Sequence, residues 1–518
     1  MHKEDYSATM ILMVGLLAAT LSGFFRQASL AHHLGTGSEA DIYLIAYSIP
    51  EFVIIALGII LPAAFIPLFA DYRLRFGEVV AWHFGLRIAG SLGILLLVVT
   101  LLAILTAPLY LPWLAPGFEP LEYVQAVRAS RLMMPAIILM GYAVLFGVAL
   151  QVYRRFEGTA LTNLTYNLTF VIVLFAVPFA WLVGRTAIAV VLGAAAALLI
   201  QLPFLWKHRR SFHISKLIRE AADGTKQRSA RLSQFTYMAG PLAIGYAMHH
   251  TIWFVDRAMA TSLGVGGVAT LNYAYRLALV VGQLSGLAVS TAVFPRLSEQ
   301  VSAEDHSGLQ TSLAGLLRFV WMIGLPATCA LIVLREPMVE VFYEHGAFGG
   351  DSTIAVSQVL VWYAIAVLAD AMCQPFWRVI YAWRSVWTVS FVNGIQTAIR
   401  ILFNIVLIRY YGLMGIAIST MIGLTLQLIV LGWLAQRRLG INFIHQYWLD
   451  ARMVIIASLI ASIAMGLIAN QLLSASTKIT LLFSASFGCI TYLAILAYSN
   501  NWRKIYSEIK SYLSPKYK

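Results

Sequence analysis

The chain has 518 residues, of which 60% are hydrophobic and 11% are charged, and its mean hydropathy is +0.79. An ordinary soluble domain is about half apolar and about a quarter charged, so this composition excludes such a domain and predicts a protein of the bilayer. The net charge of +13 does not indicate nucleic-acid binding, because the basic residues lie in short segments between apolar runs.

The apolar runs predict the transmembrane helices. A spanning helix needs about 20 mostly apolar residues, and the chain contains about 14 runs of this kind. We therefore predict an all-α integral membrane protein. In chain order the runs are 8–33, 41–70, 83–106, 128–150, 160–182, 186–206, 236–262, 267–295, 312–334, 356–382, 387–408, 413–435, 452–473 and 479–499.

The charges between these runs predict the orientation of the chain. Segment 207–235 carries eight lysine and arginine residues, whereas the loop 108–127 carries none. Cytoplasmic loops are rich in lysine and arginine, so the basic side is cytoplasmic. An even number of spans then places both termini in the cytoplasm. The charged start MHKEDY precedes an apolar stretch without a small-residue cleavage site, which predicts a retained helix and no signal peptide.

An internal repeat predicts two lobes. LGTGSEADIYLIAYSI (34–49) resembles LGVGGVATLNYAYRLA (263–278), and both follow an apolar run. Parallel repeats are typical of transporters, with the substrate path between the halves. We predict two six-helix lobes and two further C-terminal helices. The predicted parts are an N-terminal lobe (1–206), a basic cytoplasmic linker (207–235), a C-terminal lobe (236–435), and a hairpin with a basic tail (436–518).

Three arginines lie on polar faces of predicted transmembrane helices, where residues three, four or seven apart share a side. A charge at mid-bilayer costs roughly 3 kcal/mol, so these faces should line a watery cavity. Arginine binds phosphate through two parallel hydrogen bonds, which suits an anionic substrate. The faces are Arg26 with Ser22, Ser29 and His33; Arg276 with Asn272 and Gln283; and Arg400 with Asn393, Gln396 and Asn404. For each arginine, pairing with a buried acid or snorkelling to the interface is the structural alternative.

Asp256 is a carboxylate in the seventh run. It could ligate a cation, carry a proton or neutralise an arginine such as Arg257. With the neutral oxygens of Asn404 and Thr420 it forms a candidate coupling site for sodium or protons. The cysteines Cys329, Cys373 and Cys489 have no paired spacing, so neither a disulfide framework nor a metal site is expected.

Several motifs resemble, in order, those of the MurJ/MviN lipid II flippases, a family of the multidrug/oligosaccharidyl-lipid/polysaccharide exporter superfamily. They are GFFRQASLAHHLGTGSEADIYLIAYSIP (23–50), AFIPLFADYR (64–73), LAPGF (114–118) and VDRAMATSLGVGGVATLNYAYRL (255–277). The resemblance extends from the first helix to at least the twelfth. It implies a central cavity for the pyrophosphate-sugar head of a polyprenyl lipid and a groove for the tail along the last two helices.

The resemblance also implies roles for individual residues. Arg26 and Arg276 match cavity arginines, Asp41 matches an acid at the start of the second helix, and Asp256 matches a cation ligand of some members. The chain departs from the family where Ala19-Thr20 and Ile54-Ile55 replace a Ser-Arg and an Arg-Arg pair. We therefore predict substrate binding by Arg26, Asp41, Arg276, Arg400 and Asn272.

These observations predict a flippase of the bacterial plasma membrane and no enzyme. It would carry a polyprenyl-pyrophosphate-linked saccharide from the inner to the outer leaflet by alternating access. We expect a monomer whose partners are this lipid and the membrane lipids, without a cofactor. Two alternatives keep the fold: a flippase for a lipid-linked exopolysaccharide unit, and a cation-coupled small-molecule exporter. A membrane enzyme is a third, because the loop 335–355 contains several acids.

Overall fold

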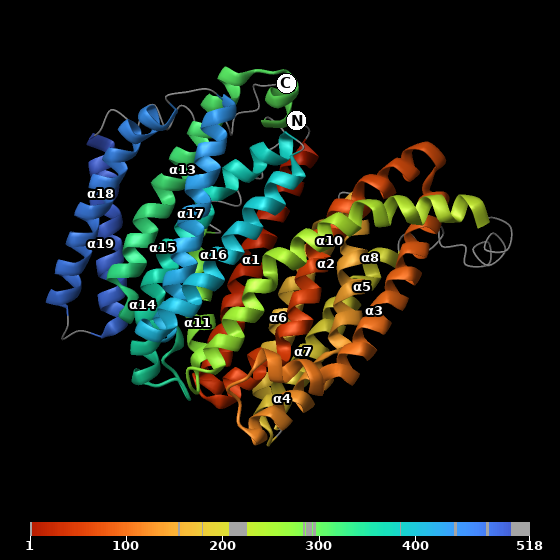
Figure 1. Ribbon diagram of the computed structural model, residues 1–518, viewed down its shortest axis with the longest axis horizontal. Helices are drawn as coiled ribbons and strands as arrows, with labels where there is room; N and C mark the ends of the chain where they lie inside the picture. The colour runs from red at the N-terminus through yellow and green to blue at the C-terminus, as the bar shows by residue number, and fades with distance from the viewer. Residues whose placement is uncertain are drawn as a thin grey trace. The chain divides into compact units, whose positions relative to one another are not determined.

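The computed structural model describes residues 3–153, 156–178, 180–206, 225–282, 285, 293, 297–383, 385–439, 443–472 and 476–498. In these ranges the regular structure is α-helical and contains no β-strand, as predicted (Figure 1). The contacts divide the chain into two units, Met1–Val268 and Ala269–Lys518.

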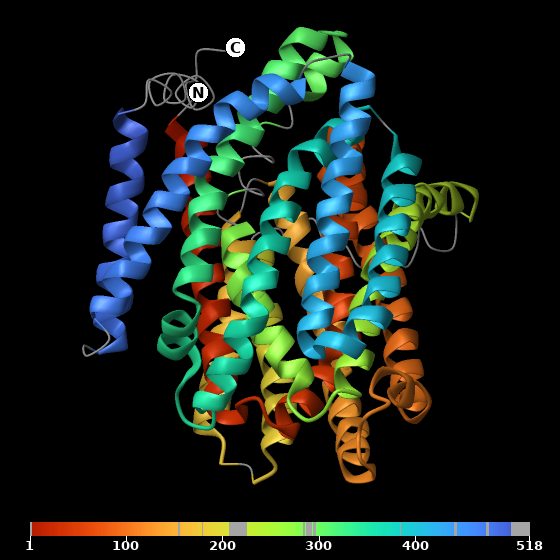
Figure 2. The same cartoon turned by 60° about the vertical axis from the view of Figure 1, so that its left-hand side comes forward.

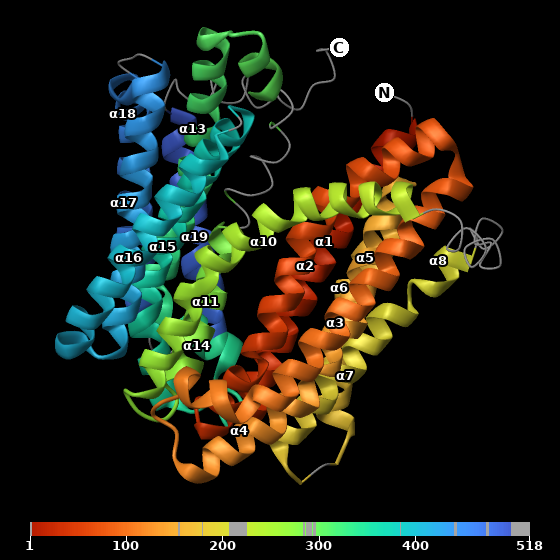
Figure 3. The same cartoon turned by 45° about the vertical axis from the view of Figure 1, so that its right-hand side comes forward.

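The N-terminal unit is built from α1 to α8 and α10. Their bounds are α1 (Lys3–Leu34), α2 (Ser38–Phe76), α3 (Glu78–Leu114), α4 (Pro120–Met133), α5 (Pro135–Val152), α6 (Phe156–Ala176), α7 (Leu182–Leu199), α8 (Leu202–Trp206) and α10 (Thr225–Thr261). α10 packs against α2 and α3 (Figure 3). It therefore belongs to this unit, although the sequence assigned its apolar run to the second lobe. Most of the predicted linker 207–235 lies outside the described residues.

The C-terminal unit contains the remaining helices. Their bounds are α11 (Gly267–Gly282), α13 (His306–Val333), α14 (Arg335–Tyr343), α15 (Gly350–Ala382), α16 (Val386–Tyr411), α17 (Leu413–Leu439), α18 (Phe443–Gln471) and α19 (Thr477–Tyr498). α17 packs between α15 and α16. The last two helices pair with each other, and α18 lies along α13 (Figure 2).

Eleven helical segments among the described residues are long and apolar enough to cross a membrane. They coincide with eleven of the predicted runs. The other three runs lie in α1, in α10 and at α11, where much of 283–295 is outside the described residues. The loop predicted at 335–355 contains the short helix α14.

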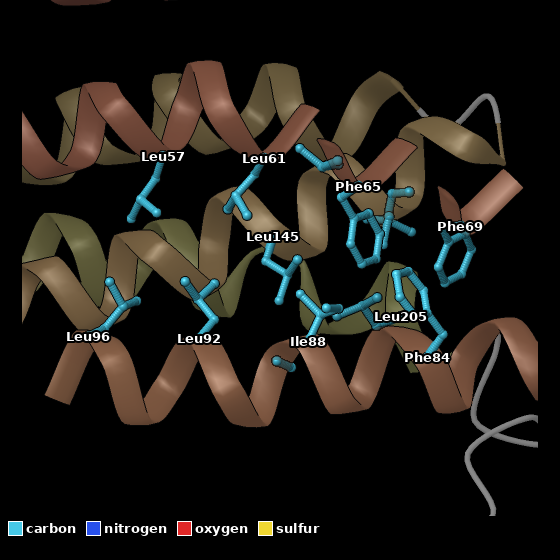
Figure 4. Packing of buried hydrophobic residues seen from close by; sticks show 14 of the residues in the cluster. Leu57, Leu61, Phe65, Phe69, Phe84, Ile88, Leu92, Leu96, Leu145 and Leu205 are labelled. Carbon is cyan, nitrogen blue, oxygen red and sulfur yellow. The ribbon is translucent and has the colours of Figure 1, made fainter. Parts of the chain in front are cut away.

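The core that positions α2 is a row of residues spaced four apart. Leu57, Leu61, Phe65 and Phe69 lie on one face of the helix and pack on α3 and α5 (Figure 4). The ring centroids of Phe65 and Phe84 are 5.9 Å apart. Full burial of each such side chain contributes about 1.5–3 kcal/mol to the stability of the fold. α2 has 39 residues, about 58 Å at 1.5 Å per residue, so it extends beyond a hydrocarbon layer of about 30 Å or tilts strongly within it.

Candidate functional site: buried arginines in the two units

Arg26 lies on α1 with only 9% of its surface exposed. Its guanidinium carbon is 5.5 Å from the ring centroid of Tyr166 and 5.6 Å from that of Phe170. Within the described part of the chain, its Nε and Nη1 atoms have no hydrogen-bond partner. The rings offer a cation–π attraction of about 0.5–2 kcal/mol but no acceptor in the plane of the guanidinium. Arg26 therefore keeps donors that an anion could use.

The aromatic wall around Arg26 consists of Tyr43 and Tyr47 from α2 and Tyr166 and Phe170 from α6. The hydroxyl oxygens of Tyr47 and Tyr166 are 3.1 Å apart. The ring of Tyr43 stacks on Tyr47 with a centroid distance of 5.8 Å. On the same face of α1, Ser22 accepts a 3.1 Å hydrogen bond from the amide of Asn167. Part of the predicted polar face of α1 thus packs on α6.

Arg257 on α10 forms the best-defined buried ion pair of the described residues. Its Nη2 donates to Oε2 of Glu51 at 2.7 Å, and its Nη1 donates to Oγ of Ser48 at 2.6 Å. The two charged side chains are only 14% and 7% exposed. Neither residue was predicted from the sequence to be part of the site. A lone glutamate directly after Pro50 in an apolar run was the signal that could have found it.

Asp41, at the start of α2, is 2% exposed. Its carboxylate accepts a 2.8 Å hydrogen bond from the backbone N–H of Gly266. Gly266 has φ +82°, and a Cβ atom there would lie 2.0 Å from the carbonyl oxygen of Thr36. Only glycine fits this close approach, so Asp41 binds the loop after α10 to the start of α2. A role of Asp41 in substrate binding stays a prediction.

The C-terminal unit buries a row of polar side chains between α16 and α17. Nη2 of Arg400 donates to Oγ1 of Thr420 at 2.8 Å, and Ser419 donates to Asn404. Two turns further along, Gln427 donates to Asn393 at 2.9 Å. The structure thus brings the predicted Arg400, Asn404 and Thr420 into one seam. A sodium ion at Thr420 would require Arg400 to move away, because the guanidinium repels a cation.

The other predicted residues are half-buried. Asn272 and Arg276 lie on α11 of the C-terminal unit, and Asp256 lies beside Arg257 on α10. Arg276 acts electrostatically on Tyr343 of α14, where burial raises the pKa of the phenol and the arginine opposes the rise. Arg26 and Arg276 belong to different units, so the predicted common cavity stays a prediction. No group of three or more potential metal ligands occurs in the described ranges.

Comparison with known proteins decides the family. The model of the lipid II flippase MurJ family matches residues 30–485, which is most of the chain. The chain belongs to the lipid II flippase MurJ family. A relative from Rhizobium meliloti named "Probable lipid II flippase MurJ" is 27% identical over 426 residues, covering 80% of this chain and 76% of its own. The lipid II flippase MurJ of Burkholderia cenocepacia is 25% identical, with 84% of each chain covered.

Solved structures show the same fold. A lipid II flippase MurJ in an inward closed conformation has a TM-score of 0.77 at 19% identity, covering 94% of this chain and 98% of that one. An inward-facing multidrug transporter of the MATE family has a TM-score of 0.70 at 16% identity, with 83% and 98% covered. The MurJ assignment confirms the predicted family and a multi-pass membrane protein, and it does not favour the exopolysaccharide or small-molecule alternatives.

One further ionisable residue of this MurJ family member was missed in the sequence. Asp370 lies on the membrane helix α15, partly buried, and Gln374 one turn later hydrogen-bonds to it. The signal was a single acid in the apolar stretch AIAVLADAMC (364–373). An ionisable residue in such a helix is a candidate for function by default. The hydrogen bond from the Gln374 side chain partly stabilises the Asp370 carboxyl within α15.

Proposed function

We propose that this protein moves lipid II across the plasma membrane of a bacterium, from the inner to the outer leaflet. Buried Arg26 carries the proposal, because its Nε and Nη1 atoms have no partner among the described residues. A diphosphate offers several acceptor oxygens and a negative charge, which are what a buried guanidinium lacks. Because Arg26 is buried, the attraction is stronger than at an exposed arginine.

The proposed activity is transport and includes no chemical reaction. A flippase leaves its cargo unchanged, so the residues bind and release the head group and catalyse no reaction. We propose alternating access by a monomer, driven by membrane potential or a sodium or proton gradient. One charge moved through 100 mV contributes about 2.3 kcal/mol. The basic segments of the sequence support cytoplasmic termini.

The test is growth of a strain depleted of its own lipid II flippase. We expect the wild-type gene to restore growth and Arg26→Ala to fail at equal protein level in the membrane. Arg26→Lys keeps the charge but loses the fork of donors, so it should restore growth only partly. Arg75→Ala, which alters an arginine whose side chain is 70% exposed, is the matched control and should behave as wild type.

An assay of lipid II accessibility in vesicles then measures transport between the leaflets directly, independently of cell growth. Arg26→Ala protein should leave lipid II in the inner leaflet. Failure of the wild-type protein in both assays would exclude lipid II as the cargo. Equal transport by Arg26→Ala and wild type would instead remove Arg26 from the mechanism.

A further inference from the structure

The carboxylate of Glu51 interacts with two arginines of the N-terminal unit. It forms the 2.7 Å ion pair with Arg257 on α10, and its charge also attracts Arg26 on α1. It acts further on Tyr246 and His250, which stand on α10 and are neutral or weakly basic groups. Glu51 is thus the negative charge around which these cationic and polar groups gather.

The pair has the geometry of an anion site that is already filled. The guanidinium of Arg257 uses Nη1 and Nη2 on two oxygens, one from Ser48 and one from Glu51. A phosphate binds arginine through the same two parallel donors. Because both side chains are mostly buried, the carboxylate and a phosphate cannot both occupy the fork of Arg257.

We propose that Glu51 is an internal competitor for the diphosphate of the substrate. This rests on the proposed function. In the empty protein Glu51 neutralises Arg257 and offsets the repulsion between Arg257 and Arg26. Without it, two buried cations would lack a compensating charge, which destabilises the fold. When lipid II enters, its diphosphate displaces Glu51 from Arg257. When the head group leaves, Glu51 returns to the arginine and prevents rebinding.

A transporter needs this competition because its cargo must be released as well as bound. Two uncompensated arginines would hold a diphosphate tightly and slow the exit step. Glu51 lowers the affinity to a value from which release is rapid. The role is one of setting affinity, and Glu51 itself makes no contact with the cargo.

The experiment measures lipid II binding to purified protein in detergent micelles. Glu51→Gln keeps a side chain of the same size that still accepts a hydrogen bond from Arg257, but it removes the charge. We expect it to bind lipid II at least tenfold more tightly than wild type and to transport it more slowly. Glu78→Gln removes the carboxylate of the exposed Arg73–Glu78 pair and, as the matched control, should leave affinity unchanged.

A double-mutant cycle with Arg257 distinguishes competition from a structural bridge. In an Arg257→Ala background, Glu51→Gln should raise affinity by much less than in the wild-type background, because the disputed fork is absent and only the weaker action of Glu51 on Arg26 remains. Unchanged or weaker binding by Glu51→Gln would overturn the proposal, as would an equal gain in both backgrounds. Should Glu51→Gln fail to fold, Glu51→Asp replaces it, with an expected gain of about threefold from the shorter reach; no gain would again overturn the proposal.

The same measurement keeps the two proposals apart. If wild type and Glu51→Gln bind lipid II with equal affinity, the proposed function stands and the proposal that Glu51 competes with the diphosphate is refuted. Absence of lipid II binding by both wild type and Glu51→Gln overturns the proposed function, and the competitor with it.

Discussion

Replacement of Gly266 by alanine tests the contact that joins the end of α10 to the start of α2. Gly266 has φ +82° and donates its N–H to buried Asp41 at 2.8 Å. An alanine Cβ would lie 2.0 Å from the carbonyl oxygen of Thr36, more than 1 Å inside a normal contact of about 3.5 Å. The loop must therefore move away from α2.

The expected cost has two parts. The left-handed backbone costs a residue with a Cβ about 1–2 kcal/mol. Movement of the loop lengthens the hydrogen bond to the charged Asp41, which is worth about 1.5–3 kcal/mol. We therefore expect Gly266→Ala to lower the free energy of unfolding by about 2.5–5 kcal/mol.

Gly264→Ala is the matched control. Gly264 also has a positive φ, +121°, but a Cβ there meets nothing within 4 Å, so it should incur only the backbone cost of about 1–2 kcal/mol. The assay is unfolding of both purified variants by titration with a denaturing detergent. Equal losses of stability in the two variants would refute the close approach of Gly266 and Thr36, and with it the anchoring role of Asp41.

Three further predictions follow from the other contacts. Gly423→Ala should displace Arg400 from Thr420, because the new Cβ would lie 2.4 Å from Cγ of Arg400. If sodium protects only this variant from heat denaturation, Arg400 excludes the ion from Thr420 in the wild type. Arg276→Ala should abolish lipid II transport while the protein stays folded, and full activity in the leaflet-accessibility assay would remove Arg276 from the site. The N–H of Gly308 and the hydroxyl of Ser307 hold the pKa of exposed Asp305 below its usual range, so the stability gained from this helix cap is present above about pH 4 and is lost as pH falls through the lowered pKa. Asp305→Asn should show less of this acid dependence in unfolding experiments from neutral to acid pH.

The helices could be predicted from the sequence because the bilayer imposes a length and an apolar composition on each span. Eleven predicted runs recur as candidate spans. The motifs around Arg26 and Asp41 also sufficed to predict the family. In both cases the information is local, since a window of about 20 residues contains it.

Pairings between distant residues could not be predicted. Glu51 and Arg257 are separated by 206 positions, and Gly266 and Asp41 by 225. A helical face can be predicted from spacing, but the helix that covers it depends on packing of the whole unit. Thus Asp256 was a plausible partner for Arg257 in the sequence, whereas the structure pairs Arg257 with α2.

The charges of Arg26, Arg257 and Arg400 are compensated to different extents, and this difference predicts which arginine attracts the substrate first. Glu51 supplies a full opposite charge to Arg257, and Thr420 supplies a neutral oxygen to Arg400. Arg26 has the rings of Tyr166 and Phe170 and a weaker share of the Glu51 charge, and its Nε and Nη1 atoms have no hydrogen-bond partner among the described residues. Removal of charge compensation raises the attraction for an incoming anion. A diphosphate should therefore bind Arg26 before it displaces Glu51, so Arg26→Ala should weaken lipid II binding in both the wild-type and the Glu51→Gln backgrounds.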